Sequence, residues 1–172
     1  GTGTLRRTVD AASPTPLLWT TGGSPWIEGP LFDYTPTTTA INQNNLAIFV
    51  RQARGARVIN NRIIGRWYVG IESRSGSQDI IANNDVRYTE NRGIYVSSLD
   101  SINSNGVIVA NNLIWGYAAD DTTKRMAYGL NVTCYGVGGL ESRDTQIIGN
   151  RVYGVNGDAV LVGDEAWRTV IK

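Results

Sequence analysis

The stretch that decides the fold is VINNRIIGRWYVGIE, residues 58–72, because its landmarks return along the chain. Asn61 is followed nine positions later by a small residue and a β-branched aliphatic residue, Gly70-Ile71. The same arrangement begins three more times, at Asn84, Asn112 and Asn150. The copy at Asn112 carries eight extra residues between the same landmarks. A constant inner segment with a variable repeat length indicates one structural coil with loops inserted at fixed corners.

Two columns of β-branched residues surround the repeated Asn. Val58, Ile81, Val109 and Ile147 stand three positions before it, and Ile63, Val86, Ile114 and Val152 stand two positions after it. Such columns are typical of buried strand positions. Asn suits a tight corner because it tolerates left-handed backbone angles, and stacked Asn side chains can form a hydrogen-bonded ladder. We therefore expect these Asn residues to be structural.

A second strand is expected after each corner, and its alternation directs aliphatic residues inward. The residues expected to point outward in one column are Glu72, Tyr95, Asn131 and Leu161. Another outward column, on a different face, is expected to contain Ile64, Arg87, Trp115 and Tyr153. A third, less regular strand is expected in each coil. No helical period of 3.6 residues competes with this pattern.

The repeated motifs are Asn60-Asn61-Arg62-Ile63, Asn83-Asn84-Asp85-Val86, Asn111-Asn112-Leu113-Ile114 and Gly149-Asn150-Arg151-Val152. They resemble the loose V-x-x-N-x-I coil signature of the pectin-lyase-like superfamily, over residues 41–163. The resemblance implies an all-β fold, a right-handed parallel β-helix, with about five to six coils in residues 41–172.

The ends of the chain give two further expectations. All five prolines lie in residues 1–40, which we expect to form an irregular N-terminal segment with short strands near Ile27-Glu28 and Leu31-Phe32. No amphipathic capping helix is visible, and residues 169–172 read as a strand that stops in mid-coil. An uncapped stack exposes unpaired edge groups. We therefore expect either a piece of a longer protein or a homo-oligomer, a trimer, whose subunits cover the exposed surface.

Composition narrows the chemistry. The formal net charge of +1 gives no global attraction to nucleic acid or to an anionic membrane, and neither is expected as a partner. The chain contains no histidine, which excludes Ser-His-Asp and Cys-His nucleophile systems and His-bearing zinc sites within it. Catalysis by this chain would have to use carboxylates, Tyr, Lys or Arg.

A sugar-binding groove is predicted beside the first outward column. Long loops on a rigid scaffold are where binding residues concentrate. Two insertions in one coil cover residues 118–125 and 135–144, and a third covers residues 97–105 in the coil before. Aromatic faces stack on sugar rings, and polar tips bind hydroxyl groups. The predicted substrate-binding residues are Tyr95, Asn131, Tyr128, Tyr135, Lys124 and Arg125. The alternative is an ordinary solvated strand face.

The resemblance also implies action on acidic or complex polysaccharides, by lyases, hydrolases, epimerases or phage tailspike depolymerases, and hence an extracellular or virion-surface location. The superfamily's histidine-containing motifs have no match here, so the tailspike-like group fits best. A hydrolase needs two carboxylates about 5–9.5 Å apart. Neighbouring coils stack about 4.8 Å apart, which such a pair can span. The candidate catalytic carboxylates are Glu72, paired with Glu90, and Asp120 or Asp121, paired with Glu141.

Other functions remain open. In a lyase, Tyr95, Tyr128, Lys124 or Arg125 is the candidate base, with an Arg that neutralises the uronate. Asp120-Asp121 is a candidate calcium site because hard cations prefer carboxylate oxygens, although no cofactor is required. A glycan-binding or structural β-helix without catalysis, in a fibre or adhesin, is the main alternative to an enzyme.

Overall fold

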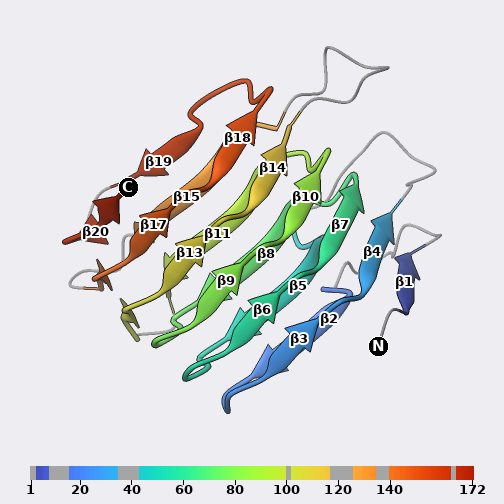
Figure 1. Ribbon diagram of the computed structural model, residues 1–172. Coiled ribbons are helices and arrows are strands. Elements are labelled where there is room, and N and C mark those ends of the chain that lie inside the picture. The colour runs from blue at the N-terminus through green and yellow to red at the C-terminus, as the bar shows by residue number, and fades with distance from the viewer. Residues whose placement is uncertain are drawn as a thin grey trace.

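The computed structural model describes residues 3–7, 16–34, 43–99, 102–116, 126–134, 140–163 and 166–172. Within these residues the chain forms strands that stack in parallel, in sequence order from one end of the molecule to the other (Figure 1). The described residues include no helix with the length and apolarity of a membrane span.

Three six-stranded sheets form the sides of the stack, and each coil crosses all three. Sheet A contains β1 (Thr4–Arg7), β4 (Leu31–Tyr34), β7 (Arg62–Gly65), β10 (Asp85–Arg87), β14 (Leu113–Trp115) and β18 (Arg151–Tyr153). Sheet B contains β2 (Leu18–Thr21), β5 (Leu46–Arg51), β8 (Val69–Arg74), β11 (Arg92–Ser98), β15 (Tyr128–Cys134) and β19 (Val160–Val162). Sheet C contains β3 (Trp26–Glu28), β6 (Arg57–Ile59), β9 (Ile80–Ala82), β13 (Ile108–Ala110), β17 (Gln146–Ile148) and β21 (Val170–Ile171).

A short fourth sheet, sheet D, lies between sheets B and C in the later coils. Its strands are β12 (Ser104–Asn105), β16 (Ser142–Arg143) and β20 (Ala166–Trp167). All the pairings within the four sheets are parallel, which is the pattern of a parallel β-helix. The predicted all-β fold and its five to six coils are thus confirmed.

The core lies inside the coils and is formed by the two predicted columns together with inward residues of sheet B such as Ile71, Ile94 and Leu130. Sheet C contributes Val58, Ile81, Val109 and Ile147, and sheet A contributes Ile63, Val86 and Ile114, all of which are buried. The sheet pairings align these residues from coil to coil. The β-branched side chains of one coil therefore pack on those of the next, which no coil could achieve alone.

The predicted asparagine ladder is present at the corner between sheets C and A. Each ladder Asn donates from Nδ2 to the Oδ1 of the Asn one coil later: Asn61 to Asn84 at 3.0 Å, Asn84 to Asn112 at 3.0 Å and Asn112 to Asn150 at 2.9 Å. The backbone N–H of each donor Asn contacts the same oxygen at 2.9–3.0 Å. The left-handed angle, however, belongs to the preceding residue, at Asn60, Asn83, Asn111 and Gly149.

The ladder begins at Asn61 because of the residue one coil earlier. Register places Pro30 beside Asn61, since Leu31 pairs with Arg62. Proline has no backbone N–H and no side-chain amide, so it offers neither of the two donors that the other coils supply. Accordingly, the buried Oδ1 of Asn61 has no hydrogen-bond partner in the described part of the chain.

The predicted irregular segment at residues 1–40 needs correction. The predicted short strands are present as β3 and β4, but together with β2 they form a regular coil. These three strands pair in parallel with β5, β6 and β7. The β-helix therefore begins before residue 41. The prolines misled the prediction: the described ones, Pro16, Pro25 and Pro30, stand between strands, where a missing N–H interrupts no ladder of strand hydrogen bonds.

Candidate functional site

The outer face of sheet B brings together most of the described candidate residues. Parallel register pairs Glu72 with Tyr95, Tyr95 with Asn131, and Asn131 with Leu161. The predicted outward column is therefore confirmed, and Phe49 extends it by one coil beside Glu72. A second column on the same face pairs Val69 with Arg92 and Arg92 with Tyr128.

This column is buried, although its residues point away from the core. Glu72, Tyr95 and Asn131 are each only 2% exposed. Leu46, Phe49, Val69 and Tyr95 form a second apolar cluster on this face, with Tyr68 packed against it. The alternative of a solvated strand face is therefore wrong here. Long arginine side chains lie against the column: Arg74 contacts Glu72, and Arg92 lies over the Tyr95 ring.

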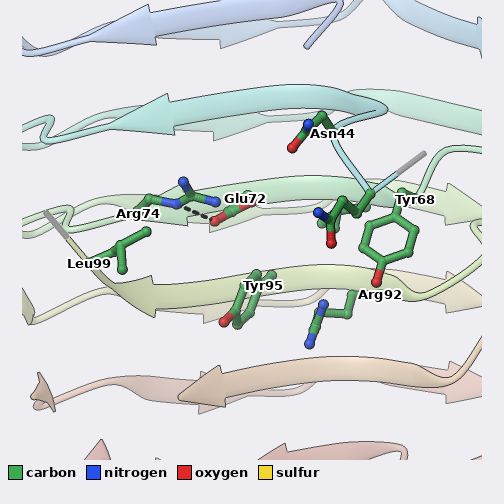
Figure 2. A pocket seen from close by; sticks show the side chains of 9 residues that line it. Asn44, Tyr68, Glu72, Arg74, Arg92, Tyr95 and Leu99 are labelled. Atoms are coloured by element: carbon green, nitrogen blue, oxygen red, sulfur yellow. Dashed lines mark hydrogen bonds and ion pairs between the residues drawn. The ribbon is translucent and has the colours of Figure 1, made fainter. Parts of the chain in front are cut away.

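A pocket of about 300 Å³ opens in this face (Figure 2). It is lined by Gln43, Asn44, Tyr68, Val69, Glu72, Arg74, Arg92, Tyr95 and Leu99. Figure 2 shows Arg74 beside Glu72 towards one end of the pocket and Tyr68 with Arg92 towards the other. The pocket thus combines aromatic rings, two guanidinium groups, amides and one carboxylate.

Glu72 is held by two donors. Arg74 Nε donates to Glu72 Oε1 at 2.7 Å, and Ser97 Oγ donates to the same oxygen at 3.1 Å. Burial raises the pKa of the Glu72 carboxyl, while Arg74, Ser97 and Arg92 act in the opposite direction. Burial disfavours the charged form because the protein interior solvates it less well than water. The pKa of the Glu72 carboxyl therefore lies above its ordinary value, because the effect of burial exceeds that of the nearby arginines and Ser97.

Arg92 lies over two aromatic rings. Its guanidinium carbon is 4.5 Å from the centre of the Tyr95 ring and 5.8 Å from that of the Tyr128 ring. Arg92 Nε is buried and has no hydrogen-bond partner among the described residues. The Oδ1 of Asn131, one coil beyond Tyr95, is also buried and also has no hydrogen-bond partner among the described residues. Buried polar atoms are nearly always paired, so this part of the face favours additional polar contacts.

The charges of the lining leave the pocket cationic. Arg74 and Arg92 carry two positive charges, and an ionised Glu72 carries one negative charge, which gives a net charge of +1. Protonation of Glu72 would raise this to +2. Because an arginine fork matches the geometry of carboxylate and sulfate oxygens, such a pocket is suited to an anionic group.

The structure does not place Glu90 opposite Glu72. Glu90 N–H donates to Trp67 O at 2.7 Å, so Glu90 stands one coil beyond Trp67, in the corner before β11. Its carboxylate pairs with Arg66. The predicted Glu72–Glu90 pair is therefore wrong, because register places Tyr95 beside Glu72.

Glu141 also lies apart from the pocket. It pairs with Arg143 beside sheet D and lines a second hollow of about 410 Å³ with Arg143, Trp167 and Arg168. Its predicted partners Asp120 and Asp121 lie outside the described residues, as do Lys124, Arg125 and Tyr135. The predicted calcium site at Asp120-Asp121 therefore stays a prediction. Among the described residues no cluster of three acidic or cysteine side chains could hold a metal.

Sequence reasoning missed Arg74 and Arg92. Both occupy strand positions whose register follows from the repeat: Arg74 pairs with Arg51, and Arg92 pairs with Val69. Two-residue alternation along β8 would have placed Arg74 on the same face as Glu72. Along β11 it would have placed Arg92 inward with Ile94 and Val96, so the position of Arg92 over Tyr95 could not be predicted in this way.

Comparison with known proteins adds one finding. A family model described as a right-handed β-helix region matches residues 33–136, more than half of the chain. The chain belongs to the right-handed β-helix family. No match is found among curated proteins, and none among solved structures. Membership of this family establishes that the coil is right-handed, but it indicates no reaction. The function of this β-helix therefore depends on the residues of its surface.

The other predicted outward column lies on sheet A of the β-helix. Register pairs Ile64 with Arg87, Arg87 with Trp115, and Trp115 with Tyr153. The rings of Trp115 and Tyr153 lie 5.3 Å apart and are 39% and 46% exposed. Self-association through this face, as in a trimer, stays a prediction.

Proposed function

We propose that this right-handed β-helix binds an acidic polysaccharide on the outer face of sheet B. The observation that carries the proposal is the environment of Arg92. Its guanidinium lies over Tyr95 and Tyr128, and its buried Nε has no partner among the described residues. A cation fixed by aromatic rings loses little further freedom when it binds an anion.

The remaining lining supports a sugar rather than a small inorganic anion. The half-buried Tyr68 offers aromatic surface, and Gln43 and Asn44 offer amides that can bind hydroxyl groups. A uronic acid presents all three required features: a ring, hydroxyl groups and a carboxylate. Such a ligand agrees with the proposed extracellular or virion-surface location.

Binding to immobilised polygalacturonate, compared with neutral dextran, tests the proposal. We expect Arg92→Met to weaken binding to polygalacturonate by at least about tenfold, since a hydrogen bond to a charged group contributes about 1.5–3 kcal/mol. Arg151→Met is the matched control, because Arg151 is exposed on sheet A, outside the pocket. Unchanged binding by a folded Arg92→Met variant, or equal binding of both polymers by the wild type, would contradict the proposal.

Cleavage by β-elimination is the second candidate. It needs a base and a cation that neutralises the uronate, and the half-buried Tyr128 with Arg92 near its ring offers both. Hydrolysis has less support, because Glu72 is the single carboxylate among the described lining residues and two are needed. Digestion of polygalacturonate distinguishes these cases: a lyase generates ultraviolet-absorbing unsaturated ends, a hydrolase generates reducing ends alone, and a binding module generates neither.

A further inference from the structure

The second arginine of the pocket already holds a carboxylate, that of Glu72. Arg74 Nε donates to Glu72 Oε1 at 2.7 Å, and Arg74 also lies over the Phe49 ring at 4.7 Å. The Arg74 side chain is 27% exposed, whereas Glu72 is nearly fully buried. Arg74 therefore lines the pocket, and the buried carboxylate of Glu72 compensates its positive charge.

We propose that Glu72 competes with the glycan carboxylate for Arg74, so that protonation of Glu72 releases Arg74 and strengthens glycan binding in acid. This inference rests on the proposed binding of an acidic polysaccharide and identifies how that same site is regulated. Glu72 and the ligand each supply a carboxylate to one guanidinium, and each weakens the binding of the other.

The surroundings of Glu72 make it the group that titrates. Arg74 faces it from β8, and Arg92, Tyr95 and Ser97 face it from β11. On β5, Phe49 lies beside Glu72 and Arg51 lies beside Arg74. Burial opposes the charged form of Glu72, and the neighbouring arginines favour it. Since arginine stays protonated throughout the accessible pH range, the carboxyl is the member of this cluster that changes charge in acid.

Linkage determines the size of the effect. A like charge within about 4–6 Å raises a carboxyl pKa by about one unit or more. The coupling is reciprocal, so the proton and the anion strengthen each other by the same factor. One pKa unit corresponds to a tenfold change in affinity, and we therefore expect about tenfold tighter binding when Glu72 is protonated.

Titration calorimetry with a sulfated oligosaccharide tests this, because a sulfate stays anionic at every pH used. The wild type should bind about tenfold more tightly at low pH and take up protons on binding, as detected in buffers of different ionisation enthalpy. Glu72→Gln should bind tightly at all pH values and take up no proton. Arg74→Met should bind weakly with a flat pH profile. Asp85→Asn is the matched control, since Asp85 pairs with Arg87 on sheet A.

The outcomes separate the two proposals. Binding that is independent of pH in the wild type and unchanged in Glu72→Gln would overturn the role of Glu72 and leave acidic-glycan binding intact. Absence of binding by the wild type to both polygalacturonate and the sulfated probe would overturn both proposals. A wild type that binds more weakly in acid would also overturn the role of Glu72.

Discussion

The asparagine ladder shows how a single residue type stabilises the coil. Asn84 illustrates it: Oδ1 accepts from the backbone and the side chain of Asn61, and Nδ2 donates to Val58 O and to Asn112 Oδ1. Asn84 is buried, so these groups have no access to water. Each amide therefore satisfies backbone groups that the corner leaves outside the sheets.

We expect Asn84→Ala to lower the free energy of unfolding by about 3 kcal/mol or more, because it removes several buried hydrogen bonds and leaves the donors of Asn61 unpaired. Denaturant unfolding followed by circular dichroism measures this. Asn156→Ala is the control, since Asn156 is exposed. A difference between the two variants below about 0.5 kcal/mol would contradict a stabilising role for the ladder.

The ladder was predictable from residue type, because Asn residues that recur at the same corner of successive coils can hydrogen-bond to one another through their amides. Residue type did not predict the burial of Glu72. Its surroundings come from neighbouring coils: Ser97 Oγ on β11 donates to Glu72 Oε1, and Phe49 on β5 and Tyr95 on β11 stand beside it.

Among the elements, strands β8, β11 and β15 of sheet B have a glycine as their second residue, at Gly70, Gly93 and Gly129. At Gly93, an added Cβ would lie 2.6 Å from Ile114 Cγ2 and 2.8 Å from Gly129 O. At Gly129, it would lie 2.3 Å from Val152 Cγ1 and 2.6 Å from Ala159 O. The small residue at this point of each coil is therefore required by the close approach of a sheet A side chain and of the next coil's backbone.

We expect Gly93→Ala to destabilise the fold by about 1–3 kcal/mol through overpacking, measured as a lowered denaturant midpoint with an unchanged slope. Gly3→Ala is the matched control, because an added Cβ at Gly3 meets nothing within 4 Å. Equal stability of the two variants would show that the coil relaxes to admit a methyl group at position 93.

Strand register was predictable because, in a parallel solenoid, only one alignment of each strand with the next keeps the apolar residues of every coil inside. The partners of Glu72 followed from this register. Glu90 was misplaced because it belongs to a corner, and corners do not follow the two-residue alternation of strands.

For the whole molecule, two buried acidic groups link stability to pH. Burial raises the pKa of Glu72 and of Asp79; Arg74 opposes this for Glu72, and the Ala56 N–H for Asp79. A raised folded-state pKa means that the folded chain binds more protons than the unfolded chain between the two pKa values. Stability should therefore fall as pH rises through the interval above the ordinary values of 4.5 and 3.8.

Thermal unfolding across this pH range measures the effect. Glu72→Gln and Asp79→Asn should each flatten the decline in melting temperature, because each removes a group that must ionise while buried. Asp158→Asn, at an exposed position, should leave the slope unchanged. A wild-type melting temperature that rises through the same interval would contradict the assignment.

The sequence by itself determined the coil, its inward columns, the ladder and the alignment of Glu72 with Tyr95 and Asn131, because all of these repeat along the chain and a repeat reports local spacing. Only the tertiary structure decided that residues 16–34 already form a coil, that Glu90 and Glu141 lie outside the pocket, and that Arg92 completes it. These features depend on which side chains from different coils and corners meet across the surface. Such contacts arise from three-dimensional packing, and the spacing of residues along the sequence does not report them.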